Sequence, residues 1–201
     1  MEITLAQDKA FNALIYFAEN IKPLYLTKAI KLLYIADEMA MKQSGVPVTW
    51  LNYKVWKLGP VAEDVYQKVK SAHLGHQKGD GSHSISHLTV SSRSGALGDG
   101  ILLEPAKAFD DSQFSDYDIE ILDTVIKQYG KLNSDQLIDI LHAEGTLWHK
   151  KVTANNLEEQ FALKSNRSDF VIELTELLDT DFKKSAFEVA YQSYLMQNEL
   201  L

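Results

Sequence analysis

The sequence LTKAIKLLYIAD at residues 26–37 decides the fold. Its apolar residues recur at spacings of three and four, which places them on one face of an α-helix. Continued by one turn, this face consists of Ile30, Leu33, Tyr34 and Met41. Thr27 is expected to cap the start of the helix, and Gly45 to end it. A helix with such an apolar face must be buried against neighbouring elements.

Further elements are predicted on both sides of this helix. Upstream, an apolar stripe over residues 10–21 indicates a helix that Pro23 closes. Downstream, residues 46–57 are rich in β-branched and aromatic side chains, which favours a short extended segment. Gly59-Pro60 is then expected to open a third helix, because proline at a first helical position loses no hydrogen bond.

The rest of the chain is predicted to form a β-favouring region followed by helices. Residues 75–100 are rich in Gly, Ser and His, and the runs 85–90 and 101–103 favour strands, so we expect a β-hairpin or mobile loop. The later helices are expected at 115–130, 134–142, 168–178 and 181–200.

The predicted fold class is mainly α, a compact multi-helix domain with a minor β element in the form of a short strand or hairpin. Its core should be packed around Phe17, Leu33, Val65, Leu122 and Leu141. The C-terminal helices should dock on this core, because their apolar stripes would otherwise be exposed. These stripes contain Ile172, Phe182, Val189 and Tyr194.

Charge and composition exclude several function classes. The 201 residues carry a formal net charge of −8. A protein that neutralises phosphates needs a dense basic surface, so nucleic acid is disfavoured as principal partner except through a local basic patch. The absence of cysteine excludes disulfides and thiolate sites and fits a reducing cytoplasm. No apolar run approaches the roughly 18 residues of a membrane span, and the N-terminus lacks signal-peptide features. We expect a cytoplasmic protein.

Candidate catalytic groups are few. Four histidines fall close together, at His73, His76, His83 and His87. Their spacing resembles that of metal ligands, but an exposed Gly/Ser loop with incidental histidines is the preferred interpretation. His142 and Glu144 do not form the zinc-protease pattern, which needs two histidines one helical turn apart. No nucleophile motif or phosphate loop is present. We therefore expect no enzyme activity, no metal site and no cofactor.

Aromatic residues surround the extended segment and are candidates for a binding surface. Such side chains serve equally well in a core, and Trp56 is the member that most favours core packing. Trp50 and Tyr53 are expected at the edge of the segment. A helix opened by Gly59-Pro60 would offer free N–H groups to a partner's carboxylate, unless the dipeptide is only a turn. The candidate partner-binding residues are Trp50, Tyr53, Gly59, Pro60 and Tyr66.

Several of these stretches together carry a family resemblance. The first half of the pattern comprises residues 26–37, GVPV at 45–48 and YKVWKLGPVAEDVY at 53–66. The second half comprises FS at 114–115, IEILDTVI at 119–126, Tyr129-Gly130, Leu137, Leu141-His142 and Trp148. In this order the chain resembles the SocA-like antitoxin domain, also called the Panacea domain, over about residues 8–152.

The resemblance implies the antitoxin half of a toxin–antitoxin or phage-associated gene pair, which neutralises its cognate toxin by direct contact and is not an enzyme. The family-motif residues to which it assigns a structural part are Lys31, Tyr34, Trp56, His142 and Trp148. Residues 153–201 would form a C-terminal helical extension packed on the domain. Because the shared domain meets unrelated toxins, partner choice is expected in 75–100 and in this extension.

Three functional hypotheses follow from the sequence. The preferred one is an antitoxin that binds a cognate toxin. The alternative is a DNA-binding regulator of its own operon, which would require a basic face on the folded surface. The third is a metal hydrolase that uses the histidines, which metal analysis of the purified protein would test.

Overall fold

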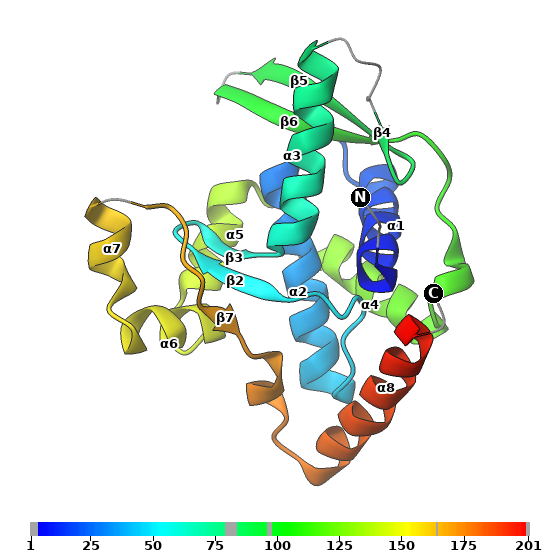
Figure 1. The fold of residues 1–201 in the computed structure, drawn as a ribbon, viewed down its shortest axis with the longest axis vertical. Helices are drawn as coiled ribbons and strands as arrows, with labels where there is room; N and C mark the ends of the chain where they lie inside the picture. The colour runs from blue at the N-terminus through cyan, green and yellow to red at the C-terminus, as the bar shows by residue number, and fades with distance from the viewer. Residues whose placement is uncertain (1–3, 79–83, 96–97, 164, 200–201) are drawn as a thin grey trace.

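The structure is a computed structural model that describes residues 4–78, 84–95, 98–163 and 165–199. It is mainly α-helical with two small antiparallel sheets, which confirms the predicted fold class (Figure 1). The helices are α1 (Leu5–Asn20), α2 (Leu26–Ser44), α3 (Glu63–Lys78), α4 (Asp116–Tyr129), α5 (Ser134–His142), α6 (Leu147–Ala154), α7 (Leu157–Leu163) and α8 (Asp181–Glu199). Two 3-10 helices, η1 (Asp111–Gln113) and η2 (Leu174–Leu177), lie between them.

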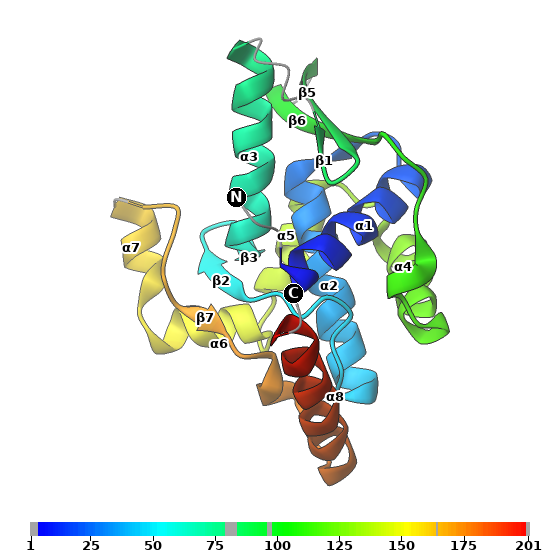
Figure 2. The same cartoon turned by 45° about the vertical axis from the view of Figure 1, so that its right-hand side comes forward.

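Helix α2 runs through the middle of the molecule, and elements from both ends of the chain pack around it (Figures 1 and 2). It is buried on nearly all sides along its first four turns, not on one face alone. Its N-cap is Tyr25 and not Thr27, because Tyr25 is still in an extended conformation at the end of a strand. Gly45 ends the helix in the left-handed conformation with φ 84°, as predicted.

The strands form two sheets that lie apart in the fold. They are β1 (Leu24–Tyr25), β2 (Tyr53–Trp56), β3 (Gly59–Val61), β4 (Ser84–Ile85), β5 (Leu88–Gly95), β6 (Gly98–Pro105) and β7 (Val171–Ile172). One sheet has the order β1-β6-β5-β4 and lies beside α3 (Figure 1). Its central hairpin confirms the hairpin that was predicted for this region. The other sheet has the order β3-β2-β7.

The prediction that Gly59-Pro60 opens a helix is wrong. Gly59–Val61 is a strand that pairs antiparallel with β2, with Pro60 opposite Val55, and the helix begins only at Glu63. Proline is compatible with this position because β3 is an edge strand, where a missing N–H leaves no ladder bond unmade. Gly59 supplies the positive φ of 108° that the turn requires.

The helix expected at 168–178 is also absent from the structure. Its first part is β7, which pairs with β2 through Tyr53–Ile172 and Lys54–Val171, and its second part is η2. Backbone hydrogen bonds from Val55 to Phe170 and from Lys57 to Asn166 extend this alignment. The C-terminal extension is therefore built into the same sheet as β2.

Helix α8 has nearly the predicted bounds but a different exposed face. Phe182 and Val189, which were expected to help dock it, are 76% and 70% exposed. The helix instead packs beside the C-terminus of α2, where the backbone of Lys183 lies against Gly45. Its docking side is aromatic, as described below.

The core is continuous across the chain. Phe17, Leu33, Val65, Leu122 and Leu141 are all buried in one hydrophobic cluster, as predicted. None of the described helices is long and apolar enough to cross a membrane.

Candidate functional site

Three of the residues that the sequence singled out meet at one point between α2, the β2–β3 turn and the end of α5. A β-carbon placed on Gly59 would lie 3.9 Å from the Lys31 Nζ and 3.8 Å from the His142 Nε2. The Leu141 side chain, also at 3.8 Å, forms the third wall. The residues come from segments far apart in the sequence, so only the fold brings them together.

Lys31 is the most unusual member of this group. Only 2% of its surface is exposed, yet its ammonium forms no hydrogen bond or ion pair with any residue that the structure describes. Burial lowers the pKa of Lys31 to about 8, and the negative charge of Asp135 opposes this shift. Asp135 is exposed at the start of α5 and does not reach the ammonium as a salt-bridge partner. A buried cation without a bonded anion is costly to the fold.

His142 lies beside it at the last turn of α5. Its ring stacks face to face on Trp148, with centroids 3.5 Å apart and planes 5° apart. Burial, followed by the positive charge of Lys31, lowers the pKa of His142 to about 4, so the ring is neutral at physiological pH. Within the described chain its buried Nε2 has no hydrogen-bond partner.

Trp148 and Trp56 hold the site together from the side of α6 and β2. The Trp148 Nε1 donates a hydrogen bond of 2.9 Å to the Trp56 carbonyl oxygen. The Trp56 ring packs edge-on against Tyr66. The Arg167 guanidinium also lies over the Trp56 ring, 4.4 Å from its centroid. The interpretation of Trp56 as a core residue is confirmed, since it is 7% exposed.

Tyr53 was expected at the edge of the extended segment, but the structure buries it completely. Its hydroxyl donates a hydrogen bond of 2.7 Å to the Asp37 carboxylate, which also accepts from the Thr49 backbone N–H and hydroxyl. The Tyr34 ring packs edge-on against it. Burial raises the pKa of Asp37 and, together with the Asp37 charge, that of Tyr53. Tyr53 therefore lies in the core, where its hydroxyl binds the Asp37 carboxylate, and not at the edge of the segment.

Gly59 and Pro60 are buried as well, and Tyr66 is half-buried. Of the five candidate partner-binding residues, only Trp50 and Tyr66 retain accessible surface of note. Because α3 begins at Glu63, Gly59-Pro60 is not a helix N-terminus. The free N–H groups that were expected there to bind a partner's carboxylate are therefore absent from this dipeptide.

Trp50 has a different environment, because the C-terminal helix lies against it. It adopts a left-handed backbone with φ 61°, which is rare for a bulky residue. Its ring stacks on Tyr194 with centroids 5.1 Å apart and also packs against Phe187 and Tyr191. These four aromatic residues form one contact between α8 and the rest of the molecule, beside that of Lys183 with Gly45, and are hereafter the α8 aromatic contact.

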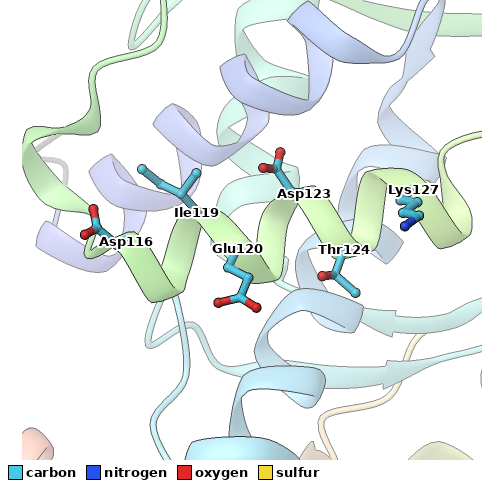
Figure 3. A pocket seen from close by; sticks show the side chains of 6 residues that line it. All are labelled: Asp116, Ile119, Glu120, Asp123, Thr124 and Lys127. Carbon is cyan, nitrogen blue, oxygen red and sulfur yellow. The ribbon is translucent and has the colours of Figure 1, made fainter.

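A surface depression is found away from these residues, along one face of α4 (Figure 3). It is lined by Asp116, Ile119, Glu120, Asp123, Thr124 and Lys127. Asp123 is already engaged, since it accepts a hydrogen bond of 2.6 Å from the Tyr16 hydroxyl. The depression gives this side of the molecule an acidic surface, in keeping with the net charge of −8.

The histidine cluster does not form a metal centre in the described part of the chain, where no three His, Asp or Glu side chains are grouped to hold an ion. His73 lies 2.6 Å from the Ser92 hydroxyl on β5, and His87 is exposed. His83 and the side chain of His76 lie outside the described residues.

Two structural features around these residues are not predicted from the sequence. Arg167 lies in a polar stretch without periodicity, so nothing local pointed to its place over Trp56. Asp37 did carry a signal, because it is an acid on an otherwise buried helix and such a group needs partners.

Comparison with known proteins identifies a family. The family model described as "Antitoxin SocA-like, Panacea domain" matches residues 30–149, which include Lys31, Gly59, His142 and Trp148. Arg167 and α8 lie beyond the matched residues. No curated protein and no solved structure matches the chain.

Proposed function

The chain belongs to the SocA-like antitoxin family through its Panacea domain, and from this membership we propose that it neutralises a cognate bacterial toxin by direct protein–protein contact. The observation that carries the proposal is the family match over residues 30–149, more than half of the chain. The acidic composition supports a protein partner over a nucleic acid. The proposal includes no enzymatic step, and it places the encounter in the cytoplasm, which the absence of cysteine fits.

We place the toxin contact on the side of the molecule that carries α8. Phe182, Val189 and Met196 are 76%, 70% and 64% exposed and follow one another at intervals of seven residues. Residues seven apart lie on the same face of a helix, so they form one apolar stripe. Exposed apolar stripes of this kind mark protein contacts. The stripe lies outside the matched domain, as is expected for the part that selects one toxin among dissimilar ones.

The test is co-expression with the product of the neighbouring gene. Growth arrest by that product alone, and rescue with formation of a complex when the chain is added, is the expected result. A neighbour that does not inhibit growth, or that is not bound, would contradict the proposal.

Substitutions locate the contact. Val189→Ser is expected to weaken the complex by about 1–3 kcal/mol, the range for anchoring apolar side chains. Trp50→Ala is expected to weaken the complex indirectly, because Trp50 packs against the docking side of α8 and holds the stripe in position. Leu163→Ser on α7 is the matched control, because Leu163 is 76% exposed but lies away from the stripe. Trp56→Ala is expected to lose about 3–5 kcal/mol of folding stability and is unsuitable for a binding test.

A further inference from the structure

We infer that Lys31, Gly59 and His142 form a receptor for a single carboxylate group. The inference rests on the proposed function only for the origin of that group, since an acidic side chain or C-terminus of the toxin would supply it. The receptor itself is a property of the free chain.

The first argument is the uncompensated charge. Lys31 has an exposed fraction of 2%, and the three N–H donors of its ammonium bind no described residue. Unlike the His142 Nε2, the Lys31 Nζ is not sealed from solvent, so the charge sits at the end of a buried side chain with only slight solvent contact. A buried charge kept without a partner in the free protein is explained when the partner arrives with a ligand.

The second argument is the missing side chain of Gly59. At the position of its absent β-carbon, the nearest atoms outside the turn itself are the His142 Nε2 and Leu141 Cδ1 at 3.8 Å and the Lys31 Nζ at 3.9 Å. A side chain here would touch both polar atoms at ordinary contact distances, so glycine leaves both of them uncovered on this side. The adjacent Leu58 is 51% exposed, which places this turn at the surface of the molecule.

The third argument concerns the kind of anion. His142 is neutral at physiological pH, so Lys31 supplies the one positive charge of the site. A carboxylate carries one negative charge and two acceptor oxygens. One oxygen can accept from the ammonium and the other from an Nε2–H of the neutral imidazole. A phosphate dianion would bring a second charge that the described site does not balance.

Formate is the probe for the free chain, because it is the smallest carboxylate. We expect formate, added in exchange for chloride at constant ionic strength, to shift the NMR signals of the Lys31 side chain and the His142 ring saturably and to raise the melting temperature. The Lys31→Met variant should lose the formate-dependent rise and melt at a higher temperature than the parent without formate. Lys28→Met is the control, because the Lys28 ammonium already donates a hydrogen bond of 2.6 Å to the Gly130 carbonyl.

The parent spectra alone decide the receptor, whether or not the variant folds. Shifts of Lys31 and His142 that do not saturate would overturn the inference, and so would an equal response of the Lys31→Met melting temperature. If formate raises the melting temperature of Lys28→Met as much as that of the parent, Lys31 is the lysine that binds formate.

The toxin complex identifies the source of the carboxylate. If the toxin supplies it, Lys31→Met should bind at least about tenfold more weakly than the parent, and formate should compete. If the variant binds the toxin undiminished while the parent binds formate, the receptor takes a free carboxylate. If the neighbouring gene product is no toxin at all, the proposed function fails while the formate result still decides the receptor.

Discussion

At the scale of single residues, Lys31 links stability to protonation. Its pKa is about 8 in the folded chain, against 10.5 for an ordinary lysine. The unfolded chain therefore binds this proton more tightly, and the charged residue lowers the free energy of unfolding, by up to about 3 kcal/mol. The penalty is fully present below pH 8 and disappears as the pH rises toward the unfolded pKa.

We expect the stability of the parent to rise between pH 7.5 and about pH 9.5, and Lys31→Met to abolish that part of the rise. Urea midpoints over this range measure it. Folding raises the pKa of Tyr53, so above about pH 10 the unfolded chain loses this proton first and stability falls as the pH rises. The measurements therefore end below pH 10. Lys42→Met, at a half-exposed lysine of the same helix that pairs with Glu38, should keep the parental dependence. Identical slopes in parent and Lys31→Met would show that folding does not lower the pKa of Lys31, which would then stay charged in the fold over this whole range.

A second residue-scale prediction concerns the buried carboxylate of Asp37. Tyr53→Phe removes one of its donors and leaves the ring in place, so we expect a loss of about 1–3 kcal/mol in unfolding free energy. Tyr66→Phe is the control, because the Tyr66 hydroxyl makes no hydrogen bond with the described residues. Chemical denaturation of the three proteins gives the comparison. A Tyr53→Phe variant as stable as the parent would mean that Asp37 does not depend on this hydroxyl.

The sequence indicated the chemistry of the site only in part. Only the family resemblance brings His142 and Lys31 together, since a lone lysine on a helix and a histidine near a helix end have no local pattern that would join them. Burial of Tyr53 could not be read from alternation, because the backbone leaves the extended conformation at Trp50 and returns to it at Tyr53. Alternation assigns faces only within an unbroken strand.

At the scale of elements, the close approach of α8 to Gly45 can be tested with a matched pair of glycines. Gly45 and Gly145 have nearly the same positive φ, 84° and 87°. A β-carbon on Gly45 would lie 2.5 Å from the Lys183 carbonyl oxygen, whereas one on Gly145 would meet nothing within 4 Å. Gly145→Ala should therefore cost only the backbone strain, about 1–2 kcal/mol.

Gly45→Ala should cost more and displace α8, because the added carbon collides with backbone that no rotamer change can move. We expect the fluorescence of Trp50 to change in Gly45→Ala, because the α8 aromatic contact opens, and to stay unchanged in Gly145→Ala. Equal effects of the two substitutions on unfolding and on fluorescence would mean that α8 does not lie against Gly45.

Elements with strong local signals were predicted well, and elements defined by distant partners were not. Helix α4 was readable because Ser115 and Asp118 form a complete capping box before an apolar stripe. Strand β7 is two residues long and exists through its pairing with β2. Its sequence alone resembles part of a helix stripe, which is why a helix was expected there. Likewise, Pro60 can lie in a strand because β3 is at the edge of its sheet, and the sequence does not show which strands lie at an edge.

At the scale of the whole molecule, the extension and the matched domain should unfold together. Strand β7 is the third strand of the sheet, and Ser168 donates a hydrogen bond of 2.5 Å to the Val55 carbonyl oxygen. We expect a single urea transition that coincides in far-UV circular dichroism and tryptophan fluorescence. A truncation after residue 180, which removes only α8, should keep this transition. A truncation after residue 164 should lower its midpoint. Two separate transitions in the full chain would show that the extension folds independently.

The pairing of β7 with β2 also has a consequence for synthesis. The ribosome adds Val171 more than a hundred residues after Lys54, its partner in the sheet. At roughly 5–20 residues per second, one edge of β2 emerges and waits several seconds for the strand that covers it. An uncovered strand edge is open to pairing with foreign strands and to proteolytic attack. Each newly made molecule thus passes through a vulnerable interval whose length is set by the rate of translation.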